Sequence, residues 1–377
     1  MDSVGCGALE DYKRYHNTKA NTLLSVYKNN PKLQLPNLEQ MGISKILFNT
    51  VPSNNYCAGK IRTINPGNDT LSSTWEIMGI IFSKRFRSVK KGFSQALIKN
   101  IEKELGTPLV GNEYIASKLA FNKYYQEHAE KRCPIIYTAD DGVVLLSAHA
   151  KIIDPKKLNA LGKKLADLLA TENVVRVITR SFTGTPNNFV RSKSDQYFPV
   201  LSNLFFLPIL NELRKHGVEI LTTEHIYNTL GKSPILKNFS NSATNKDVTR
   251  IIDRSMKQIK KPSLIIACSQ DFDKFGHAKD PIGYGKSLKQ FDDYLPKLIR
   301  NMLRDDLLII TSDHGCDPTK IMRGHTREFV PLLFYYKNNN KKIWLDTRNT
   351  FADIGQTICY NFDLKPLAVG TPVYELF

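Results

Sequence analysis

The chain has 377 residues, of which 41% are hydrophobic and 24% charged, with a formal net charge of +17. This length exceeds what one hydrophobic core usually fills, so we expect a large α/β domain carrying a second unit. No apolar stretch approaches the roughly 18 to 20 residues of a bilayer span, and the first residues lack the apolar segment of a signal peptide. We therefore expect a cytoplasmic protein that does not engage membranes.

The positive charge does not indicate nucleic-acid binding. Lysine pairs begin at residues 90, 156, 163, 260 and 341, in separate segments and without interleaved aromatic motifs. A dispersed positive field instead suits a small phosphorylated substrate. The six cysteines also lie far apart, with no C-x-x-C pair, so we expect reduced thiols with no disulfide or zinc ligand among them.

Residues 83–205 predict a smaller α+β unit inserted into a larger one. PIIYTADDGVVLLSAH (134–149) has the character of a strand and contains an acidic pair. DPKKLNALGKKLADLLATE (154–172) predicts a helix, and VVRVITRSF (174–182) a further strand. Helix and strand signals resume beyond residue 206, so we divide the chain into a core of residues 1–82 and 206–377 and an inserted domain of residues 83–205.

The C-terminal third predicts a doubly wound, mostly parallel sheet. SLIIACS (263–269), DLLIITS (306–312) and VPLLFYY (330–336) are short apolar runs typical of strands covered on both faces. Residues 283–306, between the first two runs, have the apolar stripe of an amphipathic helix, made of Leu288, Phe291, Leu295, Ile299 and Leu303. Ligands of such sheets gather beyond the carboxyl ends of the strands, where QDFDKFGH follows the first run and DHGCDPT the second.

Acids and histidines recur at these two strand ends. Asp273 and His277 are four residues apart, Asp313 and His314 are adjacent, and His325 follows eleven residues later. Carboxylate oxygens and imidazole nitrogens are ligands of divalent metals in sites that hold several ligands at once. The spacing predicts a dinuclear metal site.

Several segments, in order along nearly the whole chain, closely resemble the phosphopentomutases, members of the alkaline phosphatase superfamily of metalloenzymes. The motifs that carry the resemblance are MDSVGCG at the start, NPGNDTLSSTWEIMG (65–79), PIIYTADDGV (134–143), RSFTGTPNNF (180–189), DFDKFGH (271–277), TSDHGCDPT with GHTREFVPLLFYY, and FADIGQTI (351–358). The resemblance implies an alkaline-phosphatase-like sheet with an inserted α+β cap.

The resemblance also implies two metal ions per chain, typically Mn²⁺, although another divalent metal is possible. One would be bound by Asp2, Asp313, His314 and the Thr70 hydroxyl, and the other by Asp273, His277 and His325. For the second metal Asp271 is an alternative to Asp273, which we prefer because D-x-x-x-H is the superfamily's common spacing.

The implied reaction interconverts the 1- and 5-phosphates of ribose and deoxyribose, with Thr70 as the catalytic phosphate acceptor. A sugar bisphosphate would form as an intermediate and prime the cycle, and the cap would keep water from the phosphothreonine. NDTLSS also has a simpler interpretation, as a polar turn in which Ser or Thr caps the helix TWEIMGIIF. The two roles can coexist.

We expect a monomer.

In the cap, the resemblance assigns Asp141 and Val143 to the ribose and Arg180 to a phosphate, with Arg191 or Lys193 as the second basic ligand. The chain departs from the family at three places. Ser73-Thr74 stand where the family has Gly-His, Ala139 replaces a serine, and a lysine of a G-K-I stretch is absent around ILTTEHIY.

These departures leave open a metal-dependent phosphatase or mutase for a different phosphosugar. A noncatalytic sugar-phosphate binder also remains open, if the metal site has decayed through loss of the strand that precedes MDSVG in the family. The family also has a hydrophobic strand before MDSVG, which in this sequence stands at residue 1. This favours a coding start upstream of Met1 over loss of that strand.

Overall fold

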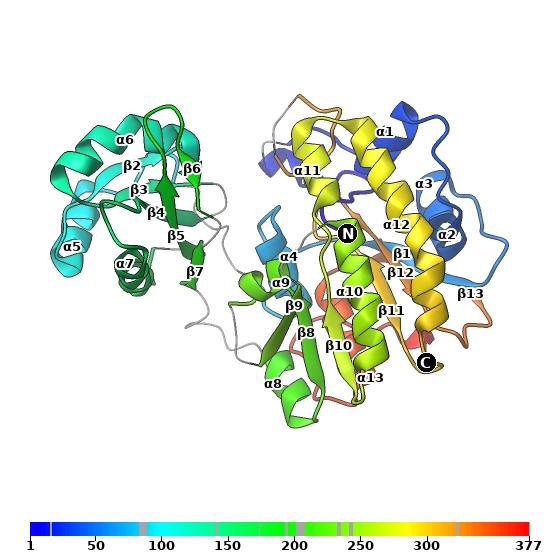
Figure 1. Ribbon diagram of the computed structural model, residues 1–377. Helices are drawn as coiled ribbons and strands as arrows, with labels where there is room; N and C mark the ends of the chain where they lie inside the picture. The colour runs from blue at the N-terminus through cyan, green and yellow to red at the C-terminus, as the bar shows by residue number, and fades with distance from the viewer. Residues whose placement is uncertain are drawn as a thin grey trace. The chain divides into compact units, whose positions relative to one another are not determined.

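The computed structural model describes residues 1–15, 17–82, 89–139, 142–172, 174–192, 195–200, 208–231, 235–240, 244–321 and 324–376. The chain divides into two compact units (Figure 1). Unit 1 consists of Met1–Ser83 and Leu207–Phe377, and unit 2 of Lys84–Phe206. No helix in the described ranges combines the length and the apolar character of a membrane span.

Unit 1 contains two sheets. The first has the order β11-β12-β1-β13, formed by Leu308–Thr311, Val330–Tyr335, Tyr56–Ile61 and Lys342–Arg348. The second has the order β10-β8-β9, formed by Ser263–Ile266, Glu219–Thr223 and Leu236–Ser240, and all of its pairings are parallel. These parallel pairings, with that of β1 and β13, confirm the predicted α/β class.

Strand β12 is the exception, because it runs antiparallel to both β11 and β1. Between β11 and β12 the described residues contain no helix that could return the chain to the other end of the sheet. Without such a crossover, consecutive neighbouring strands pair in antiparallel fashion. The segment between them, which includes His314 and His325, therefore stays at one end of the sheet.

The helices of unit 1 pack around these sheets. Their bounds are α1 Thr22–Asn29, α2 Pro36–Leu38, α3 Ser44–Phe48, α4 Thr70–Ile77, α8 Pro208–Lys215, α9 Glu224–Thr229, α10 Asn245–Gln258, α11 Asp271–Ala278, α12 Pro281–Asn301 and α13 Ala352–Asn361, with a π-turn at Glu39–Ile43 and 3₁₀ turns at Tyr12–Tyr15 and Tyr374–Leu376. Helix α12 lies beside α10 and α11 (Figure 1).

Helix α12 corresponds to the amphipathic helix expected from the sequence. Leu288 and Leu295 are fully buried in the core of unit 1, and Phe291 and Ile299 pack against that core. The prediction for Leu303 is wrong: the helix ends at Asn301, and Leu303 is 73% exposed. Met302 already has extended backbone angles, so the 3.6-residue period no longer orients the side chains that follow.

Unit 2 has one sheet of order β2-β3-β4-β5-β6, with β7 paired to β5. Its strands are Val110–Tyr114, Ile135–Thr138, Val143–His149, Arg176–Thr183, Val190–Arg191 and Gln196–Pro199, and its helices are α5 Gln95–Leu105, α6 Ser117–Lys131 and α7 Pro155–Leu168. The apolar stretch at 134–149 forms two antiparallel strands, β3 and β4, and not a single strand. Gly142, just before β4, has a positive φ of 73°, which suits the reversal.

Helix α7 is the helix expected at 154–172, and it begins where Asp154 accepts hydrogen bonds from the N–H groups of Lys156 and Lys157. It packs on β5 through Gly162. A β-carbon at this position would lie 2.1 Å from the Thr179 side chain, so only glycine allows this approach.

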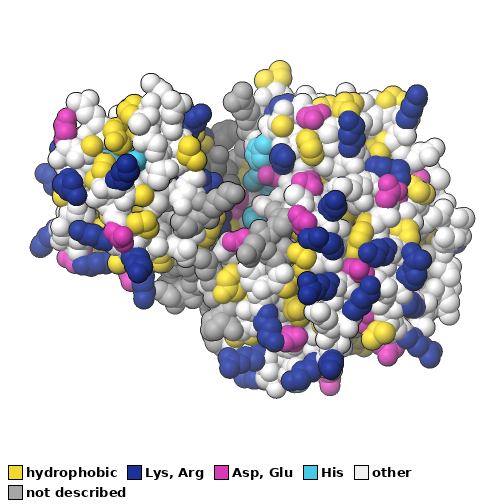
Figure 2. Space-filling model, viewed as in Figure 1, with side chains coloured by type: hydrophobic (Ala, Val, Ile, Leu, Met, Phe, Trp, Pro, Cys, Tyr) yellow, Lys and Arg dark blue, Asp and Glu magenta, His cyan; other side chains and the backbone are white. Residues whose placement is uncertain are grey.

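The basic side chains are also dispersed on the face of unit 1 that Figure 2 shows. Figure 2 shows Lys and Arg scattered among acidic side chains over the face of unit 1 in view, with no single basic stripe on that face.

Candidate metal centre

The first three residues connect the loops that follow β10 and β11. The N–H of Asp2 donates to the carbonyl of Ser269, 3.0 Å away, and the N–H of Ser3 donates to Asp313 Oδ1 at 3.0 Å. The N–H of Cys316 donates to the carbonyl of Ser3 at 3.1 Å. These bonds hold the Asp2 side chain, only 2% exposed, at the carboxyl ends of the strands.

Asp2, Asp313 and His314 form a first group of possible metal ligands, with ligand atoms within 4.8 Å of one another. His314 Nε2 lies 3.2 Å from Asp313 Oδ2 and 3.8 Å from Asp2 Oδ1. The Thr70 hydroxyl lies 3.5 Å from the same nitrogen. All three ligand side chains are buried.

Asp273, His277 and His325 form a second group, also within 4.8 Å. Asp273 Oδ1 lies 3.3 Å from His277 Nε2 and 3.5 Å from His325 Nε2. His325 Nδ1 lies 2.7 Å from the carbonyl of Asn68, so this carbonyl can orient the ring as the outer partners of metal-bound histidines do. The alternative carboxylate, Asp271, instead accepts a hydrogen bond from the N–H of Asn245 at 2.7 Å.

The two groups are adjacent. The Ser3 hydroxyl donates to Asp273 Oδ1 at 2.6 Å and lies 3.3 Å from Asp2 Oδ1. The rings of His314 and His325 stack with their centroids 3.8 Å apart. The structure thus brings together all six side chains that the sequence named as metal ligands.

The electrostatics of the first group favour a cation. Burial raises the pKa of the Asp2 carboxyl, and repulsion from Asp313 and Asp273 raises it further. Burial also acts to raise the pKa of Asp313, but His314 and the N–H of Ser3 outweigh it, so the pKa is lowered. Burial lowers the pKa of His314. Buried carboxylates this close together repel one another, and divalent cations would offset that repulsion.

The residues fit a metal in their hydrogen bonding as well. Asp313 Oδ2 is buried, and its 3.2 Å contact with His314 Nε2 does not have hydrogen-bond geometry, so this oxygen accepts no hydrogen bond within the described part of the chain. A buried carboxylate oxygen without a donor is costly unless it binds a cation. The donor set of carboxylate oxygens and imidazole nitrogens suits divalent first-row metals.

Thr70 is the first residue of α4, and this places its hydroxyl beside the first group. The helix cap is Asp69, whose side chain accepts hydrogen bonds from the Ser72 N–H at 2.9 Å and the Ser72 hydroxyl at 2.7 Å. The expectation that Ser or Thr would cap this helix is therefore wrong. Asp69 takes that position, and the Thr70 hydroxyl remains near His314.

The departure at Ser73 has a structural role. Its hydroxyl donates to the carbonyl of Asp313 at 2.6 Å and so ties α4 to the loop after β11. Both side chains are buried.

Two buried charged residues that support the site had no assigned role in the sequence analysis. Arg327 donates to the carbonyls of Asn65 and Gly67, and pairs with Asp11 at 3.0 Å. It thereby fixes the segment that leads to Thr70. The neighbouring Glu328 accepts hydrogen bonds from Thr22, Gly7 and Thr326. In the sequence, both residues follow the predicted ligand His325 closely within the GHTREF motif, and this position could have indicated their role.

In unit 2, Arg180 and Arg191 meet at one carboxylate. Arg180 Nη2 lies 2.8 Å, and Arg191 Nη2 2.6 Å, from Asp195 Oδ2. Val143 begins β4 and is half-buried. The predicted sugar contact Asp141 and the alternative base Lys193 lie outside the described residues.

Comparison with known proteins agrees with this geometry. A family model described as the Metalloenzyme superfamily matches residues 219–366. The chain is 35% identical over 372 residues to a protein named phosphopentomutase from Carboxydothermus hydrogenoformans, covering 97% of this chain and 95% of that one. It is 33% identical over 376 residues to a phosphopentomutase from Clostridioides difficile, covering 97% and 95%. The resemblance seen in the motifs is thereby confirmed, and the chain belongs to the phosphopentomutase family.

Proposed function

We propose that the chain is a phosphopentomutase that interconverts the 1- and 5-phosphates of ribose and deoxyribose through a phosphothreonine at Thr70. The observation that supports this most directly is the position of the Thr70 hydroxyl, 3.5 Å from His314 in a buried cluster of carboxylates and imidazoles. Relatives named phosphopentomutase align along nearly the whole chain and support the same substrate class.

In this proposal, Asp2, Asp313 and His314, with Thr70, hold one divalent cation, and Asp273, His277 and His325 hold the other. Two Mn²⁺ ions would lower the pKa of the Thr70 hydroxyl and stabilise negative charge on the transferring phosphoryl group. Ser3, which bonds to Asp273 and lies beside Asp2, fixes the spacing between the two ligand groups. The helix cap at Asp69 fixes the direction of the hydroxyl.

The reaction would conserve phosphate. The P–O bond to Thr70 Oγ1 breaks as a P–O bond to the free hydroxyl of the sugar monophosphate forms, giving a bisphosphate. The second phosphoryl group then returns to Thr70 Oγ1, and the isomeric monophosphate leaves. Water must be excluded, because hydrolysis of the phosphothreonine would convert the mutase into a phosphatase.

We assign the distal phosphate and the sugar to unit 2. Arg191 has a half-exposed side chain, and Arg180 has its guanidinium held by Asp195. Guanidinium groups match phosphate in bidentate geometry. Val143 and Asp141 would contact the ribose.

Replacement of Thr70 tests the nucleophile. Thr70→Ala should abolish isomerisation, because no other hydroxyl would accept the phosphoryl group, whereas Thr70→Ser should retain part of it. Mass spectrometry of the active protein should find phosphate on Thr70. Full activity of Thr70→Ala, or phosphate on a different residue, would refute the assignment.

Metal removal tests the ligand groups. Chelation should remove activity together with two equivalents of bound divalent metal, and Mn²⁺ should restore both. Metal analysis of Asp313→Asn and His277→Gln should each show loss of about one equivalent. A protein that keeps its activity in chelator contradicts the metal assignment.

The departures at Ser73-Thr74 and Ala139 favour one second candidate, a phosphatase or mutase for a different phosphosugar. Incubation with ribose 1-phosphate distinguishes them. A phosphopentomutase forms ribose 5-phosphate with little inorganic phosphate, whereas a phosphatase releases phosphate and no isomer. A mutase for another phosphosugar forms neither product.

A further inference from the structure

The two oxygens of the Asp2 carboxylate face different sets of ligands. Oδ1 lies 3.8 Å from His314 Nε2, in the first group. Oδ2 lies 3.7 Å from the thiol of Cys268, which is not part of either proposed metal group. A carboxylate in this position can bind two cations at once, one through each oxygen.

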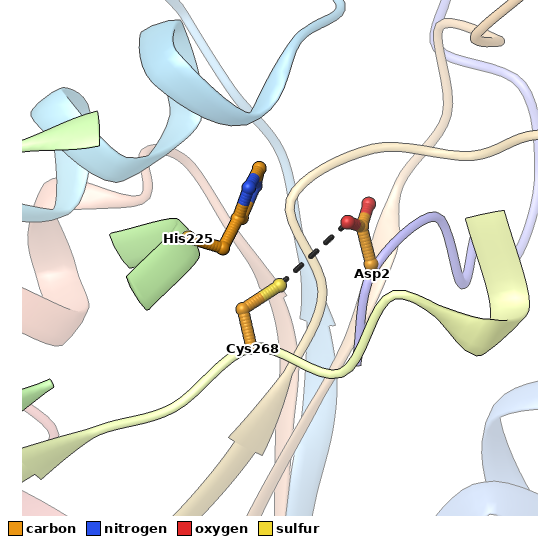
Figure 3. A group of neighbouring side chains, drawn as sticks. All are labelled: Asp2, His225 and Cys268. Atoms are coloured by element: carbon orange, nitrogen blue, oxygen red, sulfur yellow. Dashed lines mark hydrogen bonds between the residues drawn. The ribbon is translucent and has the colours of Figure 1, made fainter. Parts of the chain in front are cut away.

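His225 completes a third group with Asp2 and Cys268, and the ligand atoms of the three lie within 4.8 Å of one another. Figure 3 shows the Cys268 thiol directed toward the space between the His225 ring and the Asp2 carboxylate. The three residues come from the N-terminal segment, the first turn of α9 and the loop after β10, all within unit 1. Asp2 and Cys268 are buried, and His225 is half-buried.

We propose that Asp2, His225 and Cys268 form a separate site for one thiophilic divalent cation, Zn²⁺ or Cd²⁺, that shares Asp2 with the first group. A thiolate, an imidazole and a carboxylate are the donors that Zn²⁺ binds in tetrahedral sites, and three protein ligands leave the fourth position for water. Mn²⁺ prefers sites without sulfur, so the two kinds of site select different metals. On binding, the Cys268 thiol releases its proton to solvent as the sulfur–metal bond forms.

The surroundings hold the ligands in place. The N–H of Cys268 donates to the Thr223 hydroxyl, 3.2 Å away, at the end of the neighbouring strand β8. The side-chain amide of Gln270 lies 3.0 Å from His225 Nδ1. Since an amide can present either its N–H or its oxygen, Gln270 can orient the His225 ring for metal binding.

Occupation of this site has a consequence that rests on the proposed function. A cation held by Cys268 and His225 would bind Oδ2 of Asp2, draw the carboxylate away from His314, and weaken the bond of Oδ1 to the metal beside Thr70. Thiophilic cations therefore inhibit the Mn²⁺-loaded protein through Cys268.

The binding test uses the Mn²⁺-loaded chain titrated with Cd²⁺, followed by the ultraviolet thiolate-to-cadmium charge-transfer band. The band should saturate at one equivalent in the unaltered chain. It should be absent in Cys268→Ser and shifted at least tenfold to higher Cd²⁺ in His225→Gln, which keeps the thiol. Cys316→Ser is the matched control, because Cys316 is a buried thiol in the loop after β11 but belongs to none of the three groups, and it should retain the band.

Either of two results overturns the site: no band in the unaltered chain, or a band of equal strength in Cys268→Ser. The inhibition test compares the Zn²⁺ concentration that halves turnover. Cys268→Ser should require at least tenfold more Zn²⁺ than the unaltered chain and Cys316→Ser, and equal sensitivity refutes the shared role of Asp2. The cadmium band can be measured without turnover. If the unaltered chain shows no band but still isomerises ribose 1-phosphate, the third metal site is rejected and the proposed function stands. If the unaltered chain shows the band but has no isomerase activity, the proposed function is rejected and the third metal site stands.

Discussion

At the residue scale, the hydrogen bonds to two buried carboxylates, Glu76 and Asp313, differ. Glu76 is fully buried, and its two oxygens accept from the N–H groups of Ile64, Asn65 and Phe351. Two hydroxyls, of Thr63 and Thr350, also donate to it. Asp313 Oδ2 is also a buried oxygen, but it accepts none from the described residues. Glu76 therefore fixes the loop before Thr70, whereas Asp313 has an oxygen for a cation.

Glu76→Gln should destabilise the protein by about 1–3 kcal/mol, because each oxygen of Glu76 accepts backbone N–H groups and the amide must turn its own NH₂ toward one of them. Urea unfolding should show a lower midpoint for this variant. Glu104→Gln, on the exposed side of α5, is the control and should leave the midpoint unchanged. A Glu76→Gln midpoint equal to that of the control would show that these bonds do not contribute as described.

At the scale of elements, His128 links helix α6 to strand β4 in unit 2. Its Nδ1 lies 2.5 Å from the carbonyl of Cys133, and its Nε2 accepts from the N–H of His149 at 3.0 Å. This pattern requires a proton on Nδ1 and none on Nε2, so the ring is neutral. Burial lowers the pKa of His128 accordingly, and His149 lowers it further.

This arrangement predicts that stability falls in mild acid. The unfolded chain protonates His128 near its ordinary pKa of about 6.5, whereas the folded chain resists protonation to lower pH. The contribution of His128 to stability should therefore be constant above this pH and decrease as the pH falls through it. Calorimetric melting between pH 5 and pH 8 should show this slope, and His128→Gln should reduce it. His216→Gln, at an exposed position, should keep it.

At the scale of the whole molecule, the proposed reaction uses residues of both units. Unit 1 contains the metal-ligand groups and Thr70, and unit 2 contains the paired arginines at Asp195. If unit 2 binds the distal phosphate, its basic residues should affect substrate binding without affecting the metal content of unit 1.

Arg191→Ala should raise KM for ribose 5-phosphate by about tenfold or more, which corresponds to loss of a charged hydrogen bond of about 1.5–3 kcal/mol. Its metal content should equal that of the unaltered chain. Lys157→Ala, on the exposed surface of α7, should change neither quantity. An unchanged KM in Arg191→Ala would remove this residue from the phosphate site.

The sequence by itself determined the features that depend on neighbours along the chain. The 3.6-residue apolar period located α12, and Asp154 marked the start of α7. The motifs named the six carboxylates and histidines that the structure brings together. Periodicity and local spacing are decided within a few turns or a single strand, so a single sequence is sufficient to read them.

Only the tertiary structure decided how distant segments meet. Asp273, and not Asp271, lies with His277, and Asp69 caps α4. Strand β12 runs antiparallel to β11, and Cys268 and His225 lie beside Asp2. Each of these outcomes depends on strand order and on hydrogen bonds between residues far apart in the chain. His225 and Cys268 share no spacing pattern, and only the pairing of β8 with β10 brings them together.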